Sequence, residues 1–177
     1  MNRSLGLFAL AAGLLMPAGF AQSKAPASSS GTASCTATTN LENLIKALDE
    51  AISGPADKDR ACLRQVLYPD ARMIPVTKTR EGKFAPHVLT TEEWIEMVRK
   101  RGHVPLYEKQ VKVKSETYGT IAHLWSTYEL KSGPDAKPSL RGINSIQASF
   151  DGSRWRIMEI LWEAETPDEK IPEKYLP

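Results

Sequence analysis

The sequence has few of the residues from which metal and redox sites are commonly built. Only two of its 177 residues are cysteines and only three are histidines. No Cys-x-x-Cys pair occurs, which excludes a dithiol redox motif. No histidine and acid share one predicted face at the spacing of metal ligands. We therefore expect neither a metal ion nor another cofactor.

An excess of charge of one sign is also missing. The formal net charge is +2, and the lysines and arginines are dispersed among a similar number of acids. Nucleic-acid-binding domains carry a basic patch or stripe, and proteins held at anionic membranes carry a basic cluster. Neither pattern is found here, so we expect no nucleic-acid partner and no attraction to an anionic membrane.

The one long apolar run lies at the N-terminus. Residues 1–21 combine a single charge, Arg3, with an apolar stretch at residues 5–15 and small residues at Gly19 and Ala21. This arrangement is typical of a secretory signal peptide, and the apolar stretch is too short to span a bilayer. We expect cleavage after Ala21, export to the periplasm or the medium, and no stable membrane insertion afterwards.

The next segment, residues 22–39, is rich in serine, alanine, threonine and glycine and has no large apolar residue. Such a segment cannot bury enough surface to become ordered, so it is predicted to be a disordered tether. One domain of ordinary size then remains, residues 40–177.

The two cysteines leave two interpretations open. In an exported chain, Cys35 and Cys62 can form a disulfide that joins the tether to the second predicted helix. Alternatively, Cys62 is a small core residue on the same apolar stripe as Val66. If the disulfide forms, it would be structural, because the spacing of a redox pair is absent.

Hydrophobic periodicity predicts helices early in the chain and strands late. Apolar residues at three- and four-residue spacing indicate three helices, and two of them have a capping box at the start, Thr39 with Glu42 and Thr90 with Glu93. The predicted helices are residues 40–53, 57–67 and 91–101, and a strand is predicted at residues 71–76. Four long antiparallel strands follow, and the last two form a hairpin that turns at Asp151-Gly152. The fold class is therefore α+β.

The faces of the late strands indicate how the sheet is covered. Along residues 106–118, Tyr107 and Val113 lie on one side and Gln110 on the other, which indicates a half-solvated strand. The later strands are apolar or aromatic on both sides. Three helices can cover one face of the sheet, and we expect a second copy of the chain to cover the outer face as a homodimer.

Three stretches, in this order, resemble the nuclear transport factor 2-like superfamily, which includes ketosteroid isomerases and SnoaL-like polyketide cyclases. They are YPDARMIPV, GTIAHLWSTYEL and RGINSIQASFDGSRWRIMEILW, at residues 68–76, 119–130 and 141–162. The wording RGINSIQ…DG…RW is most similar to exported bacterial members without an assigned reaction. The resemblance implies a cone: a strongly curved antiparallel sheet wrapped by three N-terminal helices, with a mostly apolar pocket at its open end.

The resemblance also implies which residues line the pocket. Isomerase-like members point an aromatic residue inward from the last strand, in a short motif similar to MEILW, and this resemblance places Trp162 inside. An even-numbered hairpin loop puts Arg141 on that face, whereas a three-residue loop brings Asn144 inside instead. We favour the even loop. The predicted contacts to a small, partly apolar ligand are then Trp125, Arg141, Ser145, Gln147 and Trp162. A salt bridge from Arg141 to Glu129 or Glu163 is the alternative role of Arg141.

The acidic residues that the superfamily's isomerase reaction requires are missing from this chain. That reaction needs a carboxylate before the proline of the first strand, and Ile74 precedes Pro75 in this chain. The alternative to a binding domain is a SnoaL-like hydrolase, dehydratase or cyclase that uses His123 or a glutamate of perturbed pKa. Such an enzyme requires that group at the wall of an open cavity, within reach of a second polar group. A hydrogen-bonded core or interface histidine is the competing interpretation of His123.

Overall fold

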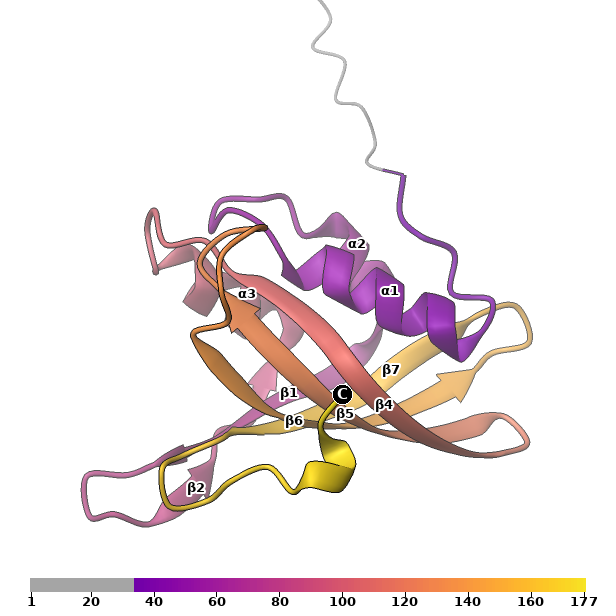
Figure 1. Cartoon of the computed structure of the whole chain (residues 1–177). Coiled ribbons are helices and arrows are strands. Elements are labelled where there is room, and N and C mark those ends of the chain that lie inside the picture. The colour runs from indigo at the N-terminus through magenta and orange to yellow at the C-terminus, as the bar shows by residue number, and fades with distance from the viewer. Residues whose placement is uncertain (1–33) are drawn as a thin grey trace, which may run out of the picture. The chain divides into compact units, whose positions relative to one another are not determined.

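The computed structural model describes residues 34–177 as a curved sheet with three helices on one side (Figure 1). The predicted signal peptide and the tether up to residue 33 lie outside the described residues. The elements are α1 (Leu41–Ile52), α2 (Ala61–Val66), β1 (Leu67–Lys78), β2 (Phe84–Pro86), β3 (Leu89–Thr90), α3 (Thr91–Arg99), β4 (Tyr107–Tyr118), β5 (Ile121–Lys131), β6 (Leu140–Phe150), β7 (Trp155–Ala164) and a short 3-10 helix (Glu173–Tyr175). No helix among these is long and apolar enough to cross a membrane.

The sheet has the strand order β2-β1-β7-β6-β5-β4, and β3 also pairs with β1. The predicted α+β class, with three helices against a strongly curved sheet, is confirmed. One detail differs, because β1 runs parallel to β7 and the sheet is therefore mixed. No hairpin joins these two strands; most of the domain lies between them in sequence, so the connection does not force them antiparallel. We call the helix-covered side the inner face and the opposite side the outer face; the C-terminal tail lies on the outer face (Figure 1).

The core lies between the helices and the inner face. α1 and α3 are amphipathic, and each turns its apolar stripe toward the sheet. Burial of this apolar surface is the main driving force for folding. Fully buried members of the core include Leu44, Leu48, Leu63, Leu67, Met73, Leu124, Ile146, Ile157 and Ile160.

The C-terminal end of α1 is held by a buried arginine. The last turn of α1 has no basic residue of its own. Instead, the guanidinium of Arg60 donates to the carbonyls of Ala51, Ile52 and Pro55. Arg60 is 2% exposed, and its guanidinium lies 5.6 Å from the ring of Trp94 in α3. It therefore satisfies the free carbonyls of one helix and ties that helix to another.

The segment before α1 is fixed to the domain. Cys35 and Cys62 form a disulfide, which joins this segment to α2. Thr38 is buried, and both its hydroxyl and its carbonyl bond the backbone of Trp155 in β7. Cys35 and Thr38, which the prediction assigned to the tether, are therefore held by the folded domain.

A β-bulge in the last hairpin changes the faces of its residues. The loop has four residues, because Phe150 pairs with Trp155, and this is an even length as predicted. Between Gln147 and Ala148, however, the register shifts, because Met158 in β7 is skipped in the pairing. One extra residue on one strand reverses the alternation of sides beyond it.

The bulge overturns the predicted grouping of pocket residues. Asn144, not Ser145, pairs with Trp162, and directly paired residues lie on the same side of a sheet. Asn144 is 3% exposed and lies on the inner face with Trp162. The prediction that Arg141, Ser145 and Gln147 share a face with Trp162 is therefore wrong, since all three lie on the outer face.

Candidate functional site

A cavity of about 230 Å³ lies between the inner face, α1 and α3. Most of its wall is apolar, and the aromatic rings of Trp94 and Trp162 are part of it. Four polar residues of the sheet also reach the wall, Thr77, Glu108, Tyr128 and Asn144, and Arg101 reaches it from the segment after α3. An apolar pocket with a few converging polar groups is the usual form of a small-molecule site.

A hydrogen-bonded polar cluster lies at this wall. Asn144 Nδ2 donates to Glu108 Oε1 and to Gln110 Oε1, each at 3.1 Å. Gln110 Nε2 donates to Glu108 Oε1 at 2.8 Å, and the Ser126 hydroxyl donates to Gln110 Oε1 at 2.5 Å. The strands β4, β5 and β6 each contribute to the cluster, which therefore depends on the register of three neighbouring strands.

Two carboxyl groups near the cavity have raised pKa values. Burial raises the pKa of Glu108 to about 7, against the opposing effect of its hydrogen bonds with Asn144 and Gln110. Burial also raises the pKa of Asp49, in α1, to about 6, although it accepts the Gln110 N–H at 3.0 Å and lies 3.4 Å from Lys109 Nζ. A carboxyl with a pKa near neutrality can both take and give a proton at physiological pH.

Tyr128 approaches the cavity by lying against a glycine. A Cβ atom at Gly142 would be 2.4 Å from the Tyr128 hydroxyl and 2.3 Å from the carbonyl oxygen of Glu163. Glycine at this position therefore lets the Tyr128 ring lie directly over the backbone of β6. Burial, and then the charges of Glu108 and Glu163, hold the pKa of Tyr128 above its usual range, so the hydroxyl keeps its proton.

The prediction that Gln110 faces solvent is wrong for the same kind of reason as in the last hairpin. The register of β4 against β5 shifts between Gln110 and Lys112. This bulge turns Gln110 onto the inner face, where it is 7% exposed. Alternation alone assigned the residue to the opposite side.

His123 does not lie at this cavity. It is on the outer face, where its Nε2 is 3.3 Å from the Ser145 hydroxyl and its ring packs edge-on against Trp125 with centroids 6.3 Å apart. The enzyme hypothesis that uses His123 therefore fails. A glutamate at the wall of an open cavity, bonded to a second polar group, is present in Glu108.

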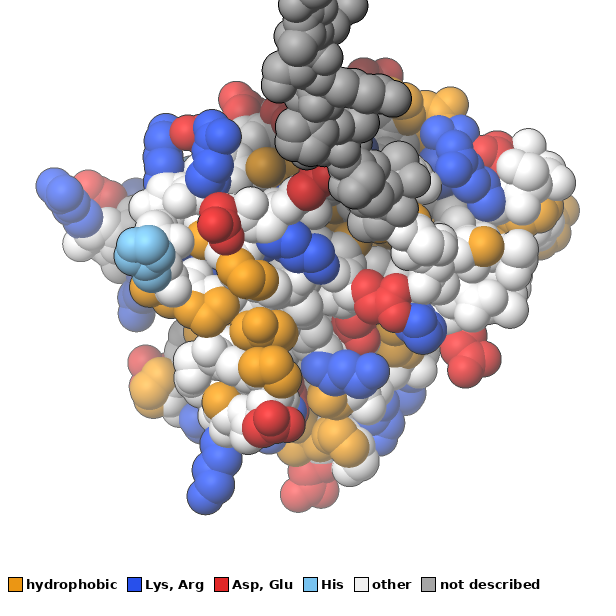
Figure 2. All heavy atoms as spheres, turned by 90° about the horizontal axis from the view of Figure 1, so that it is seen from above, with side chains coloured by type: hydrophobic (Ala, Val, Ile, Leu, Met, Phe, Trp, Pro, Cys, Tyr) orange, Lys and Arg blue, Asp and Glu red, His pale blue; other side chains and the backbone are white. Residues whose placement is uncertain are grey.

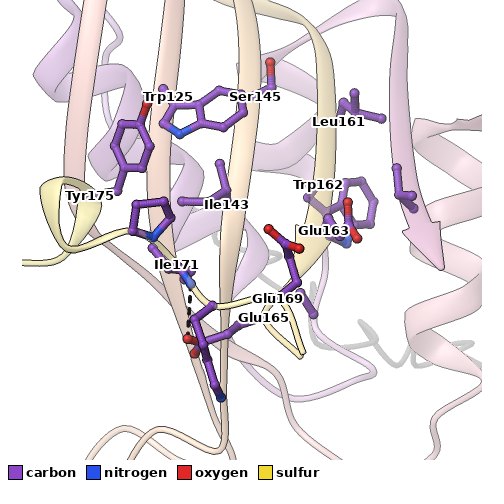
Figure 3. Close-up of a pocket in the computed structure, with 14 residues that line it drawn as sticks. Trp125, Ile143, Ser145, Leu161, Trp162, Glu163, Glu165, Glu169, Ile171 and Tyr175 are labelled. Atoms are coloured by element: carbon purple, nitrogen blue, oxygen red, sulfur yellow. Dashed lines mark hydrogen bonds between the residues drawn. The ribbon is translucent and has the colours of Figure 1, made fainter. Parts of the chain in front are cut away.

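Three of the predicted ligand contacts line a second cavity, of about 380 Å³, between the outer face and the C-terminal tail (Figure 3). They are Trp125, Ser145 and Trp162. Trp162 lines both cavities, so it is the one predicted contact that reaches the inner cavity.

The other two predicted contacts lie beside the outer cavity or away from it. Arg141 forms an ion pair with Glu165 at 2.9 Å, not with either of the glutamates predicted as its partner. Gln147 is exposed to solvent. Neither residue lines the inner cavity.

The C-terminal tail covers part of the outer face. The Thr127 hydroxyl donates to the carbonyl of Tyr175 at 2.5 Å, and the Lys112 ammonium donates to the carbonyl of Leu176. The Tyr175 ring lies 5.9 Å from that of Trp125. A homodimer through the outer face stays a prediction, and the tail occupies part of the surface that it would use.

Charges of both signs are interspersed on the helix-covered side, as Figure 2 shows. Within residues 34–177, no three or more His, Cys, Asp and Glu side chains are grouped so that they could hold a metal ion. The cavity walls, rather than a charged patch, are therefore the features that point to a ligand.

Comparison with solved structures identifies the fold. A protein of unknown function with a cystatin-like fold from Nostoc punctiforme aligns with a TM-score of 0.54 at 9% identity, over 72% of this chain and 90% of its own. A nuclear transport factor 2-like protein of unknown function from Shewanella baltica aligns with a TM-score of 0.51 at 11% identity, over 71% and 91%. This chain has the nuclear transport factor 2-like fold. No protein-family model and no curated protein matches it. Because the nuclear transport factor 2-like fold hosts many activities, function has to be argued from the site.

Proposed function

We propose that this nuclear transport factor 2-like domain is exported and binds a small, partly apolar molecule in its inner cavity. The observation that carries the proposal is the pair of Glu108 and Asn144, bonded to each other and to Gln110, at the wall of a cavity that is mostly apolar. Polar groups at such a wall orient a ligand, and the apolar wall supplies the free energy of burial. Export rests on the sequence of residues 1–21.

The chemistry of the wall favours an uncharged ligand with a hydroxyl or carbonyl oxygen. Glu108 can donate or accept a hydrogen bond near neutral pH, because its pKa is about 7. Tyr128 keeps its hydroxyl proton and supplies a further donor. An anion would be repelled by the Glu108 carboxylate, while Arg101, which also lines the wall, is exposed, so its attraction for an anion is screened; an anion is therefore the poorer fit. The cavity is smaller than the pockets that hold drug-sized ligands, so the ligand is small.

Uncharged cyclic ketones and alcohols are expected to bind in the inner cavity at millimolar concentration or below. Ligand-observed NMR with a fragment panel measures this, and two variants locate the site. Leu140 lines the inner cavity and is 37% exposed, so Leu140→Trp is expected to block the cavity without disturbing the core. Leu161→Trp places the same ring on the outer face, where Leu161 is 36% exposed, and serves as the matched control.

The expected result is a set of fragments that lose binding by at least tenfold in Leu140→Trp and keep it in Leu161→Trp. Two results would contradict the proposal. One is that no fragment binds the wild-type domain at millimolar concentration. The other is that binding survives Leu140→Trp.

A proton-transfer enzyme is the second candidate, and one observation favours it. Glu108 has a pKa of about 7 and lies at the cavity wall, hydrogen-bonded to Asn144. As a general base, its carboxylate would take a proton from a carbon next to a carbonyl group and return it to the same carbon. The sequence left two bases open for such an enzyme, His123 and a glutamate of perturbed pKa, and Glu108 is the candidate for the second.

The enzyme candidate predicts catalysed exchange of carbon-bound protons. In deuterated buffer, the protons next to the carbonyl of cyclohexanone are expected to exchange faster with the wild-type domain than with Glu108→Gln, by at least tenfold, as read by proton NMR. Glu116→Gln, an exposed change on the same strand, is the control and should match the wild type. Equal rates for wild type and Glu108→Gln would leave a binding domain as the function.

A further inference from the structure

The outer cavity is not used by the proposed function. It is the larger of the two, and its walls come from the sheet and from the C-terminal tail (Figure 3). Trp125, Ile143 and Leu161 supply the apolar side on the sheet, and Ile171 and Tyr175 supply that on the tail. The pocket therefore exists because the segment after β7 folds back over the outer face.

Acidic side chains in the wall exceed the cations available to them. Glu165 is neutralised by Arg141, at 2.9 Å. Glu163 and Glu169 have no ion-pair partner among residues 34–177, and Lys170 is the one cation in the wall of this cavity. One negative charge is therefore in excess. The wall thus combines apolar surface with an uncompensated carboxylate.

A buried donor in the same wall lacks an acceptor. Trp125 Nε1 is buried and has no hydrogen-bond partner in the described part of the chain. A buried indole N–H is normally paired, and leaving it unpaired is unfavourable. Figure 3 shows the Trp125 indole across the cavity from Glu163. A ligand in the cavity could supply the missing acceptor.

We propose that the outer cavity is a second binding site, for an organic monocation with an aromatic or apolar body and a hydrogen-bond acceptor. The excess carboxylate charge of Glu163 and Glu169 attracts the ammonium group, and because both residues are exposed, the attraction is modest and weakened by salt. The apolar walls take the body of the ligand, and aromatic faces add to the attraction for a cation. The acceptor pairs with Trp125 Nε1.

The test uses three probes of nearly equal shape. They are 4-methoxybenzylamine, which is a cation with an ether oxygen, 4-methoxybenzyl alcohol, which is neutral, and 4-methoxyphenylacetate, which is an anion. Isothermal titration calorimetry measures their affinity for the whole domain. The amine is expected to bind, at least tenfold more tightly than the alcohol and the anion, and its affinity is expected to fall as salt is raised.

Variants then assign the site. Glu163→Gln and Glu169→Gln are each expected to weaken binding of the amine about fivefold, a size typical of an exposed charge pair. Glu159→Gln lies on the same strand outside both cavities and should stay within twofold of wild type. Leu161→Trp should abolish binding by filling the cavity. Trp125→Phe should weaken the binding of 4-methoxybenzylamine but not that of benzylamine, which lacks the ether oxygen that accepts the hydrogen bond.

The proposal is overturned if the amine does not bind at millimolar concentration, or if the neutral or anionic probe binds equally well. It is also overturned if Glu163→Gln and Glu169→Gln behave as Glu159→Gln does, or if light scattering shows a dimer that Leu161→Trp disrupts. In the last case the outer face is an interface between copies of the chain. None of these results decides whether the inner cavity binds a ligand. That proposal is tested separately, by the loss of binding of uncharged fragments in Leu140→Trp.

Discussion

Replacing Arg60 by methionine is expected to destabilise the domain by about 4 kcal/mol, because three backbone carbonyls lose their donor and each unpaired buried polar group is unfavourable by about 1–3 kcal/mol. These carbonyls belong to Ala51 and Ile52 at the end of α1 and to Pro55 in the turn that follows. Methionine has a similar volume, so the change removes hydrogen bonds rather than opening a large cavity. Urea unfolding followed by circular dichroism measures the effect.

Arg64→Met is the matched control for this change. Arg64 lies one helical turn further on, is exposed, and makes its ion pair with Glu92 in contact with solvent. Exposed ion pairs contribute at most about 1 kcal/mol, so the free energy of unfolding of this variant is expected to lie within about 1 kcal/mol of that of the wild type. Equal losses in the two variants would show that the carbonyls at the end of α1 find other donors, and that Arg60 is not the residue that holds them.

The order and type of the elements could be predicted because each rests on local signals. Helical periodicity identified the three helices, and the capping box of Thr90 and Glu93 forms at the start of α3 as expected. At the start of α1, Asn40 rather than Thr39 is the N-cap, a difference of one residue. Four long strands were predicted from their composition and patterning, and the strong curvature of the sheet was implied by the resemblance to a known superfamily. These signals are all contained in short windows of sequence.

The candidate site could not be predicted, because two bulges decide it. One shift between Gln110 and Lys112 turns Gln110 inward, and another at Met158 brings Asn144 inward with Trp162. A bulge adds one residue to one strand, and the residues around Met158 carry no glycine or proline that would mark it. Strand alternation, which correctly indicates a sheet, then assigns the side chains beyond the bulge to the wrong face.

The outer cavity was also beyond prediction from sequence, for a different reason. Its tail wall comes from a proline-rich segment with no periodicity, and its position depends on long-range contacts such as that between Thr127 and Tyr175. Local composition indicates coil there but does not indicate where the coil lies. Trp125 and Ser145 were predicted to be in a pocket, and they line a cavity on the opposite side of the sheet from the one expected.

Raising the pH from about 4.5 to about 8 is expected to destabilise the domain. The pKa of Asp49 is raised to about 6 and that of Glu108 to about 7, so the folded state keeps two protons that the unfolded chain releases near pH 4. Where the folded state binds more protons, the free energy of unfolding falls as the pH rises. A shift of about two pH units corresponds to about 3 kcal/mol for one group. Carboxyls with lowered pKa values, such as Asp151, act below this window.

Glu108→Gln separates the contribution of Glu108 from that of Asp49. The amide oxygen can still accept from Asn144 and Gln110, but it does not titrate. This variant is expected to match the wild type at about pH 4.5 and to exceed its stability at about pH 8 by about 2 kcal/mol, in urea unfolding at both pH values. Glu116→Gln should follow the wild type throughout. If Glu108→Gln also follows the wild type, the Glu108 carboxyl is solvated and ionises normally in the cavity, and it is then no better suited to proton transfer than any exposed glutamate.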